Sequence, residues 1–370
     1  MRWRRLVVQV VSEGPEQSTG RAEVVPVDRP IKPLVAITMG DPAGIGAEVI
    51  VKALADREVR QLGRFVIYGS SELLSYAADL AEISVYWWRQ PHEAVGRVES
   101  GVVVADFDEF SMLGPAVARP SAEGGSASMR FLEEAVSAVQ LGRADAIVTG
   151  PISKTSWKLA GYGRWAGHTE WLGAKFGARR VTMMFDAGSL RVALASTHVG
   201  LFELRHHFTI GLVFQPIDLL DRALREWFGI ERPRIAVCSL NPHAGELGRF
   251  GDEESRIIEP AITMAREAGC TVEGPFPADT LFRDAAAGRY DGVVAMYHDQ
   301  GLIPVKLLAF DRAVNVTLGL PTIRTSPDHG TAFDIVGRNL ADAGSMKAAI
   351  RLACRLASNK LAAAQAVSPA

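Results

Sequence analysis

Residues 34–54 read Leu-Val-Ala-Ile-Thr-Met-Gly-Asp-Pro-Ala-Gly-Ile-Gly-Ala-Glu-Val-Ile-Val-Lys-Ala-Leu, and this stretch decides the fold class. Residues 34–39 are almost continuously apolar, as in a strand that is buried on both faces. Residues 40–46 carry glycine and proline in a tight loop, and residues 47–54 are typical of a helix. A buried strand, a tight loop and a helix open an α/β unit.

The same alternation recurs along the rest of the chain. Because strands alternate with amphipathic helices, we expect a largely parallel sheet that is covered by helices. At 370 residues the chain is long for one hydrophobic core, so two lobes with a cleft between them are expected. The further strands are expected at residues 65–68, 145–149, 181–185, 190–195, 234–238 and 292–296, and the clearest helices at 128–141, 217–227, 255–268 and 345–359.

The composition excludes several classes of protein. Lys and Arg number 40 against 42 Asp and Glu, so no overall basic field attracts nucleic acid or an anionic membrane. Cys238, Cys270 and Cys354 are far apart and form no CxxC pair, which indicates reduced packing residues in a cytoplasmic protein. No run approaches the roughly 20 apolar residues of a membrane helix, so we expect a soluble protein.

The N-terminal residues 1–32 show no sustained periodicity, and we expect a flexible extension rather than a domain. Basic residues precede a short apolar run at the start of this segment, as they do in a secretory signal. Gln9 interrupts the run, which is also too short, so we reject that interpretation.

Four histidines lie in loops rich in Gly, Pro, Asn and Asp. His198 ends the strand at 190–195, His243 follows the strand at 234–238, and His298 follows the strand at 292–296. His168 lies in Gly167-His168-Thr169-Glu170 before a helical segment. Ligands of open α/β sheets gather beyond the carboxyl ends of strands, and neutral imidazole is a common ligand of Zn²⁺. Each histidine alone would more often cap or pack a strand end, but four in such similar settings predict one metal and substrate site.

Polar side chains near these loops are candidates for binding a phosphate or carboxylate. Lys306, Asn315 and Arg324 follow the His298 loop, although each alone is equally consistent with a salt bridge or a turn. Asp279 lies in a Pro-rich turn, where it either orients a metal-bound histidine, handles a proton or simply forms the turn.

The glycines of the first loop fall at positions 40, 44 and 46, which is not the GxGxxG pattern of a conventional dinucleotide-binding fold. Residues 329–337, His-Gly-Thr-Ala-Phe-Asp-Ile-Val-Gly, are instead similar to the cofactor loop of the isocitrate and isopropylmalate dehydrogenases. This similarity implies that His329, Gly330 and Asp334 contact a nicotinamide cofactor.

Six longer motifs together resemble the 4-hydroxythreonine-4-phosphate dehydrogenase family, from about residue 33 to the end. The motifs are Thr-Met-Gly-Asp-Pro-Ala-Gly-Ile-Gly at 38–46, Gly-His-Thr-Glu at 167–170, Leu-Asn-Pro-His-Ala-Gly-Glu at 240–246, Pro-Ala-Asp-Thr-Leu-Phe at 277–282, Met-Tyr-His-Asp-Gln-Gly at 296–301 and Asn-Val-Thr-Leu-Gly-Leu-Pro at 315–321.

The resemblance implies an isocitrate/isopropylmalate dehydrogenase-like α/β fold of two domains, with the active site in the cleft between them. The first domain would comprise residues 33–150 and 320–370, and residues 151–319 would form the second. A homodimer is implied, with NAD or NADP as cofactor and one divalent ion, Zn²⁺, Mg²⁺ or Co²⁺, in each active site. The implied reaction is oxidation of the C3 hydroxyl of 4-phosphooxy-L-threonine, followed by loss of carbon dioxide, on the route to pyridoxal phosphate.

Carried over motif by motif, the resemblance implies a role for each candidate residue. His198, His243 and His298 would bind the metal, with His298 supplied by the neighbouring subunit. His168, Thr169, Lys306, Asn315 and Arg324 would contact the phosphorylated substrate, and Lys306 and Asp279 are the candidates for proton transfer.

Three other functions remain open from the sequence. A related dehydrogenase acting on 4-phospho-D-threonate or 4-phospho-D-erythronate would share the metal and phosphate groups. A metal-dependent hydrolase would use the histidines to activate water. A binding protein would use the metal only for stability.

Overall fold

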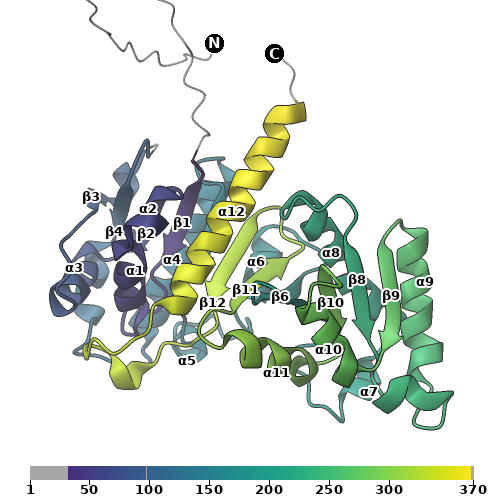
Figure 1. Ribbon diagram of the computed structural model, residues 1–370. Coiled ribbons are helices and arrows are strands. Elements are labelled where there is room, and N and C mark those ends of the chain that lie inside the picture. Colours follow the sequence, from purple (N-terminus) through teal and green to yellow (C-terminus); the bar gives the residue numbers. More distant parts are fainter. Residues whose placement is uncertain (1–31, 97, 368–370) are drawn as a thin grey trace, which may run out of the picture. The chain divides into compact units, whose positions relative to one another are not determined.

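The structure is a computed structural model that describes residues 32–96 and 98–367. Within this part of the chain, twelve strands form one sheet in the order β3-β4-β2-β1-β5-β12-β11-β6-β7-β10-β8-β9 (Figure 1). The extension predicted at residues 1–32 lies outside the described residues, except for Lys32. The strands are β1 (Leu34–Thr38), β2 (Arg64–Gly69), β3 (Trp88–Pro91), β4 (Val102–Asp106), β5 (Ala146–Thr149), β6 (Thr182–Asp186), β7 (Arg191–Leu194), β8 (Arg234–Cys238), β9 (Thr271–Phe276), β10 (Gly292–Ala295), β11 (Val314–Leu318) and β12 (Ile323–Pro327).

Helices connect most of these strands. In residues 32–96 and 98–367, no helix is both long and apolar enough to cross a membrane. The α-helices are α1 (Gly46–Ala55), α2 (Arg57–Gln61), α3 (Ser71–Leu80), α4 (Ala122–Gln140), α5 (Lys154–Leu159), α6 (His168–Lys175), α7 (Leu204–His207), α8 (Ile210–Glu226), α9 (Glu259–Glu267), α10 (Ala278–Ala286), α11 (His298–Ala309) and α12 (Gly344–Val367).

The sheet is largely parallel, which confirms the prediction. Among the strand pairs, β1/β2, β1/β5, β5/β12, β2/β4, β3/β4, β7/β10, β8/β10 and β8/β9 are parallel. The antiparallel pairs β12/β11, β11/β6 and β6/β7 lie together in the middle of the sheet.

The β11/β12 turn contains Gly319, whose φ is +91° and where a Cβ would lie 2.2 Å from the Arg180 carbonyl oxygen. Only glycine fits such a turn without strain.

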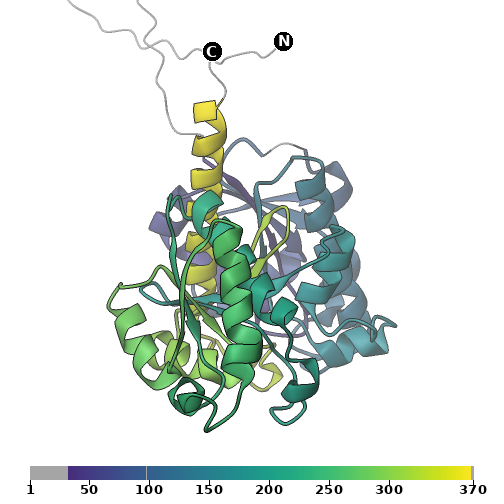
Figure 2. The same cartoon turned by 90° about the vertical axis from the view of Figure 1, so that its right-hand side faces the viewer.

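Helices cover both faces of the sheet. The crossover from β1 to β2 through α1 and the crossover from β4 to β5 through α4 run in opposite directions along the sheet. Because such crossovers are right-handed, α1 and α4 lie on opposite faces. Helix α12 packs against α1, β12 and β5, and Figure 1 shows it running alongside these strands. Figure 2 looks onto the β9 end of the sheet, where α8 and α9 pack together.

The loop between β1 and α1 depends on two glycines. Gly40 has a φ of +80°, and a Cβ there would lie 2.1 Å from the Pro151 carbonyl oxygen. A Cβ at Gly46 would lie 2.0 Å from the Met39 carbonyl oxygen. The chain therefore turns back on the end of β1 at a distance that no side chain permits, and this brings the start of α1 to the carboxyl edge of the sheet.

Several helices differ from their predicted bounds. Helix α4 begins at Ala122 instead of residue 128, because Ser121 caps it by accepting from the Gly124 N–H. Helix α8 begins at Ile210, and its Pro216 lies inside the helix rather than before it. The helix predicted at 255–268 is a π-turn at Glu254–Ile258 followed by α9, in which Pro260 lacks the N–H for a regular bond.

The division into domains at 33–150 with 320–370, and at 151–319, stays a prediction. Residues 32–370 form one compact unit, and the sheet continues across the predicted boundary. That boundary falls at the β11/β12 turn, where the antiparallel pairs begin.

Candidate active site

The three predicted metal ligands lie beyond the carboxyl ends of three neighbouring strands. Strands β7, β10 and β8 are adjacent and parallel, so their carboxyl ends point to the same edge of the sheet. His198 lies in the loop after β7, His243 in the loop after β8, and His298 at the first residue of α11 after β10. The order of strands in the sheet therefore gathers three loops that are far apart in the sequence.

His198 and His298 face one another across this edge. Their ring centroids are 6.1 Å apart. Nδ1 of His298 lies 2.7 Å from Oδ1 of Asp299, which leaves Nε2 for a metal or substrate. Partial burial lowers the pKa of His198, with further lowering from the charges of Lys154 and His298. His198 is therefore neutral at neutral pH, as a metal ligand must be.

His243 lies on a strained turn. Its backbone has φ 52° and ψ 32°, and Ala244 also has a left-handed conformation. Non-glycine residues adopt this conformation at a cost, and such strain is often found at functional sites. Buried Glu254 holds the preceding loop, because its Oε1 accepts from the backbone N–H groups of Leu240 (2.8 Å) and Asn241 (2.7 Å).

The three imidazoles do not form a complete ligand set within one chain. Among the described residues, no group of three or more His, Cys, Asp or Glu side chains is arranged to hold a metal ion. The donor set itself fits a divalent ion, because it offers a neutral imidazole, an imidazole oriented by a carboxylate, and a third imidazole on a fixed turn.

Arg324 lies deep in the fold without a carboxylate partner among the described residues. Its side chain is on β12 and the residue is 2% exposed. Its guanidinium donates to the hydroxyls of Thr149 (2.6 Å) and Thr317 (3.1 Å), while Nε has no hydrogen-bond partner in the described part of the chain. Burial lowers the pKa of Arg324 to about 9, so the group is still charged at neutral pH. A buried cation that lacks a counter-ion is a site for an anionic ligand.

Three more predicted substrate residues have buried polar atoms without a partner among residues 32–96 and 98–367. These atoms are His168 Nε2, Thr169 Oγ1 and Asn315 Oδ1. Burial lowers the pKa of His168 well below its usual value, and the charge of Arg324 lowers it further. Since a native fold leaves few buried polar groups unpaired, these atoms indicate a polar ligand.

Two of these residues lie within strands that were not predicted from the sequence. Asn315 is in β11 and Arg324 is in β12. Asn315 pairs with Ser326, and directly paired residues point to the same face of the sheet. Ser326 and Arg324 are two residues apart on β12, so Asn315 and Arg324 also point to the same face. The strand setting fixes their side chains more firmly than a loop would.

The two predicted proton-transfer residues have different surroundings. Lys306, on α11, forms an ion pair with Asp328, with 2.8 Å between Nζ and Oδ2. Asp328 directly follows β12, so the pair joins the His298 helix to the end of the Arg324 strand. Asp279 lies exposed in the first turn of α10, and no contact joins it to the other candidates.

The predicted cofactor loop lies against the β1–α1 loop. The N–H of Ile45 donates to the carbonyl oxygen of Thr331, one residue after Gly330. His329 Nε2 is buried without a partner among the described residues, whereas Gly330 and Asp334 are exposed. The loop therefore leaves polar groups available for a ligand at the carboxyl edge of β1 and β12.

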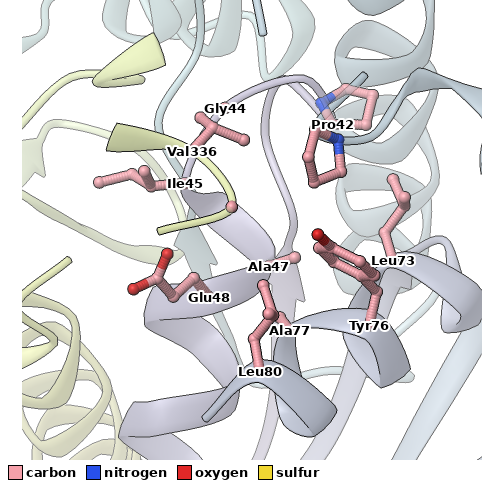
Figure 3. Close-up of a pocket in the computed structure, with 12 residues that line it drawn as sticks. Pro42, Gly44, Ile45, Ala47, Glu48, Leu73, Tyr76, Ala77, Leu80 and Val336 are labelled. Atoms are coloured by element: carbon pink, nitrogen blue, oxygen red, sulfur yellow. The ribbon is translucent and has the colours of Figure 1, made fainter. Parts of the chain in front are cut away.

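Beside this loop lies a pocket of about 390 Å³ (Figure 3). Its walls are mostly apolar and come from the β1–α1 loop, α1, α3 and the end of the predicted cofactor loop. None of the four site histidines lines it. Its lining residues include Pro42, Ile45, Leu73, Tyr76, Val336 and Gly337.

The sequence did not single out several residues of the site. Thr149 ends β5 and Thr317 lies in β11, and only the pairing of these strands with β12 brings them to Arg324. Lys154 and Glu170 both influence the pKa of His198, and both side chains lie near Gly167. The position of Glu170 within the Gly-His-Thr-Glu motif was the one available signal.

Comparison with known proteins gives a consistent match. The family described as "Pyridoxal phosphate biosynthetic protein PdxA" matches residues 61–353. A 4-hydroxythreonine-4-phosphate dehydrogenase from Geobacter metallireducens is 46% identical over 329 residues, which cover 88% of this chain and 96% of the relative. A D-threonate 4-phosphate dehydrogenase from Cupriavidus necator is 43% identical over 334 residues, covering 89% and 98%.

A solved structure shares the fold. The crystal structure of 4-hydroxythreonine-4-phosphate dehydrogenase from Klebsiella pneumoniae superposes with a TM-score of 0.79 at 38% sequence identity, and covers 88% of this chain and 99% of that one. The predicted α/β class and the predicted family are both confirmed. With a family match across most of the described residues and relatives above 40% identity along nearly their whole length, this chain belongs to the PdxA family of pyridoxal phosphate biosynthetic proteins.

Proposed function

We propose that the chain is an NAD(P)-dependent dehydrogenase that oxidises the C3 hydroxyl of 4-phosphooxy-L-threonine. The product, 2-amino-3-oxo-4-phosphooxybutanoate, would lose carbon dioxide to give 3-amino-2-oxopropyl phosphate. The observation that carries this proposal is buried Arg324, a cation without a counter-ion that lies beside unpaired polar atoms of the predicted substrate residues. The names of the relatives support the same activity.

The phosphate or carboxylate of the substrate would bind at Arg324. Two threonine hydroxyls already hold the guanidinium plane, so it is oriented before the ligand arrives. Thr169 and Asn315 would then supply the hydrogen bonds that their unpaired oxygen atoms lack. Binding an anion offsets the cost of burying this charge, which makes the site selective for anionic ligands.

His168 would contact the substrate as a neutral imidazole. Its lowered pKa keeps it uncharged, and its unpaired Nε2 accepts or donates one hydrogen bond, depending on the tautomer. The Trp157 ring packs edge-on against it at 5.6 Å, which fixes the orientation of the imidazole.

His198, His243 and His298 would hold the divalent ion. When bound, the ion lowers the pKa of the substrate hydroxyl and the nicotinamide accepts the hydride. The hydroxyl proton must leave in the same reaction. We assign it to the Lys306–Asp328 pair, which joins the His298 helix to the Arg324 strand, with Asp279 as the other candidate.

The nicotinamide cofactor would bind along the loop that carries His329, Gly330 and Asp334. The pocket beside this loop supports the proposal, since an apolar pocket at the carboxyl edge of the sheet suits a flat aromatic ring such as adenine (Figure 3). Tyr76 and Glu48 are the lining residues with polar side-chain groups.

A homodimer would complete the site. Large apolar side chains are exposed after each of the three histidines, as expected of a protein interface. Phe202 is 88% exposed after His198, and Leu307 is 82% exposed on the helix that begins at His298. Because the described residues of one chain do not gather three such ligands, we propose that a second copy supplies one of them.

The second candidate function is oxidation of 4-phospho-D-threonate, which has a hydroxyl at C2 where 4-phosphooxy-L-threonine has an amine. The other alternative substrate is 4-phospho-D-erythronate. Oxidation of 4-phospho-D-threonate is favoured by the D-threonate 4-phosphate dehydrogenase from Cupriavidus necator, whose 43% identity to this chain lies between the 46% of the Geobacter metallireducens relative and the 40% of a 4-hydroxythreonine-4-phosphate dehydrogenase from Nostoc. The groups at Arg324 and the histidines would serve all of these substrates.

A kinetic comparison tests the proposal. The full-length protein is assayed with 4-phosphooxy-L-threonine, 4-phospho-D-threonate and 4-phospho-D-erythronate, with NAD and NADP in turn and with Zn²⁺, Mg²⁺ or Co²⁺. We expect reduced nucleotide to form with the highest kcat/KM for 4-phosphooxy-L-threonine. A higher kcat/KM for either other substrate would assign the second function, and consumption of substrate without nucleotide reduction would indicate a hydrolase.

A further inference from the structure

The side chain of Gln300 bridges two strands at the point where their pairing ends. The ladder between β10 and β8 ends at Val294 and Val237. Two residues later, the Met296 N–H donates to Oε1 of Gln300 at 2.7 Å, and Nε2 of Gln300 donates to the Ser239 carbonyl oxygen at 2.8 Å. The side-chain amide thus takes the place of the next backbone bond between the strands.

The other side of Met296 is tied to β7. Its carbonyl oxygen accepts from the Ser196 hydroxyl at 2.8 Å and from the Ser196 N–H at 3.2 Å. Ser196 precedes His198 by two residues, and Met296 precedes His298 by two. One hydrogen-bonded chain therefore connects the three strand ends that lead to the histidines.

The bridge continues into the loop that carries His243. The Ser239 hydroxyl donates to the Asn241 carbonyl oxygen at 3.0 Å, and Glu254 binds the N–H groups of the next residues. The position of the β8 loop relative to α11 therefore depends on Gln300.

The chemistry of the bridge requires an amide. Gln300 accepts with its oxygen and donates with its nitrogen, and the two partners are a backbone N–H and a backbone carbonyl. A carboxylate would place negative charge against the Ser239 carbonyl oxygen. An aliphatic side chain would leave both backbone groups unpaired, which is costly in a partly buried site.

We propose that Gln300 is a positioning residue that sets the affinity of the divalent-metal site, by holding both the His243 loop and the start of the His298 helix in place at the edge of the sheet. This inference rests on the proposed function, because the three histidines are metal ligands only by that proposal. It holds whether an imidazole serves a metal in its own chain or one shared with a second copy, since each loop must be held against the sheet edge in either case. Groups that orient metal ligands in this way typically contribute 10–100-fold to affinity, as an order of magnitude.

The test measures Co²⁺ binding to the full-length protein and to its Gln300→Leu and Gln300→Glu variants. Two readouts are taken, the affinity from titration and the visible absorption spectrum of bound Co²⁺, which reports ligand geometry. We expect both variants to bind Co²⁺ about 10–100-fold more weakly, with an altered spectrum. Thermal unfolding of the metal-free proteins shows whether each variant folds.

Asn359→Leu is the matched control. Asn359, on α12, is also partly buried and also donates from its side-chain amide to a backbone oxygen, that of Trp227, at 2.9 Å. Trp227 follows α8 and precedes the amino end of β8, so this variant loses a comparable hydrogen bond away from the three carboxyl ends. It should keep the wild-type affinity and spectrum.

The outcomes separate the inference from the function on which it rests. If Gln300→Leu folds and binds Co²⁺ as the wild type does, the positioning role is wrong. If instead His243→Ala binds Co²⁺ with the same affinity as the wild type, the proposed metal site itself is wrong. Should neither Gln300 variant fold, Gln300→Asn keeps the amide but shortens the side chain by one methylene, so it cannot reach both backbone groups, and unchanged affinity and spectrum in that variant would overturn the inference.

Discussion

Arg324 carries a charge that the described residues do not neutralise. Most buried charges in proteins are paired with an opposite charge, because an isolated one is costly to desolvate. Arg324 has only threonine hydroxyls and the more distant charge of Glu170, which acts against the lowering of its pKa. If Arg324 binds the anionic substrate as proposed, the fold would keep this site ready at the expense of its own stability.

Replacing Arg324 tests this interpretation. Arg324→Met removes the charge, so we expect the KM for the phosphorylated substrate to rise about 10–100-fold, the loss expected for a hydrogen bond to a charged group. The melting temperature should not decrease, because the variant no longer buries an unpaired charge. Steady-state kinetics and thermal unfolding measure the two effects. Arg234→Lys, at the exposed pair with Asp291, is the control, and an equal rise in KM there would contradict the assignment.

His168 makes stability depend on pH. Its pKa in the folded protein lies well below 6.5, the usual value for histidine, so between the two values the unfolded chain binds more protons. Stability from this group is complete above pH 6.5 and falls as the pH decreases below it. His168→Asn should show a shallower fall in melting temperature below pH 6.5 than the wild type. If the melting temperatures of the variant and the wild type fall equally as the pH decreases below 6.5, His168 is not buried as a neutral group.

At the scale of whole elements, Glu254 fixes the loop after β8. Its carboxylate binds two backbone N–H groups and the Asn241 side chain, and it sits in the π-turn that precedes α9. This carboxylate lies beside the left-handed turn that carries His243, since a Cβ at Gly245 would lie 2.8 Å from Glu254 Oε2.

Glu254→Gln should weaken this loop. One carboxylate oxygen becomes an NH₂ group, which cannot accept from Asn241, so we expect the free energy of unfolding to decrease by about 1–3 kcal/mol. Metal affinity should also decrease, because His243 is less firmly placed. Chemical denaturation and metal titration measure both changes. The exposed Glu259→Gln serves as control, and identical behaviour of the two variants would show that Glu254 has no part in holding the loop.

The elements also show how much of the fold the sequence could predict. Strands such as β1 and β5 were predicted because burial on both faces leaves an uninterrupted apolar run. Strand β4, which is equally apolar and buried, was not among the predictions, and neither were β3 and β9. Strands β11 and β12 were missed, since Asn315, Thr317 and Arg324 face a polar site and break that pattern. Helix α4 was placed too short because Gly124 and Gly125 disfavour helix, yet Gly125 is needed where a Cβ would lie 2.1 Å from the Ser156 carbonyl oxygen.

The residues of the candidate site could also be predicted only in part from the sequence. Histidines after strand ends could be predicted, because the direction of parallel strands brings their loops to one edge. Thr149 and Gln300 could not, since their roles depend on which strands become neighbours in the sheet. Strand order arises from the packing of the whole chain and leaves no local signal in these residues.

At the scale of the whole molecule, the site is proposed to need two chains. His198 and His298 face one another, while His243 is not grouped with them, and apolar side chains surround the loops of all three. The family resemblance assigns His298 to the neighbouring subunit. There are thus two arrangements to consider. Either His298 comes from the neighbouring subunit, or His198 and His298 of one chain act together with His243 of the neighbouring subunit. In both, His243 and His298 of one active site would come from different chains.

Mixing two inactive variants tests the shared site. In a heterodimer of His243→Ala with His298→Ala, one site lacks both ligands and the other retains all three. We expect a mixture refolded together to recover activity that neither variant shows alone. No recovery, with heterodimers demonstrated by mass spectrometry, would place His243 and His298 in the same chain's site.

The central claim is that the imidazoles beyond β7, β10 and β8 hold a metal ion on which the oxidation depends. The most direct measurement determines metal content and nucleotide reduction in the same samples of wild-type and His243→Ala protein, with 4-phosphooxy-L-threonine as substrate. We expect one ion per active site in the wild type, a rate of nucleotide reduction proportional to metal content, and loss of both in the variant. Undiminished nucleotide reduction by metal-stripped wild type, or by His243→Ala, would contradict the account.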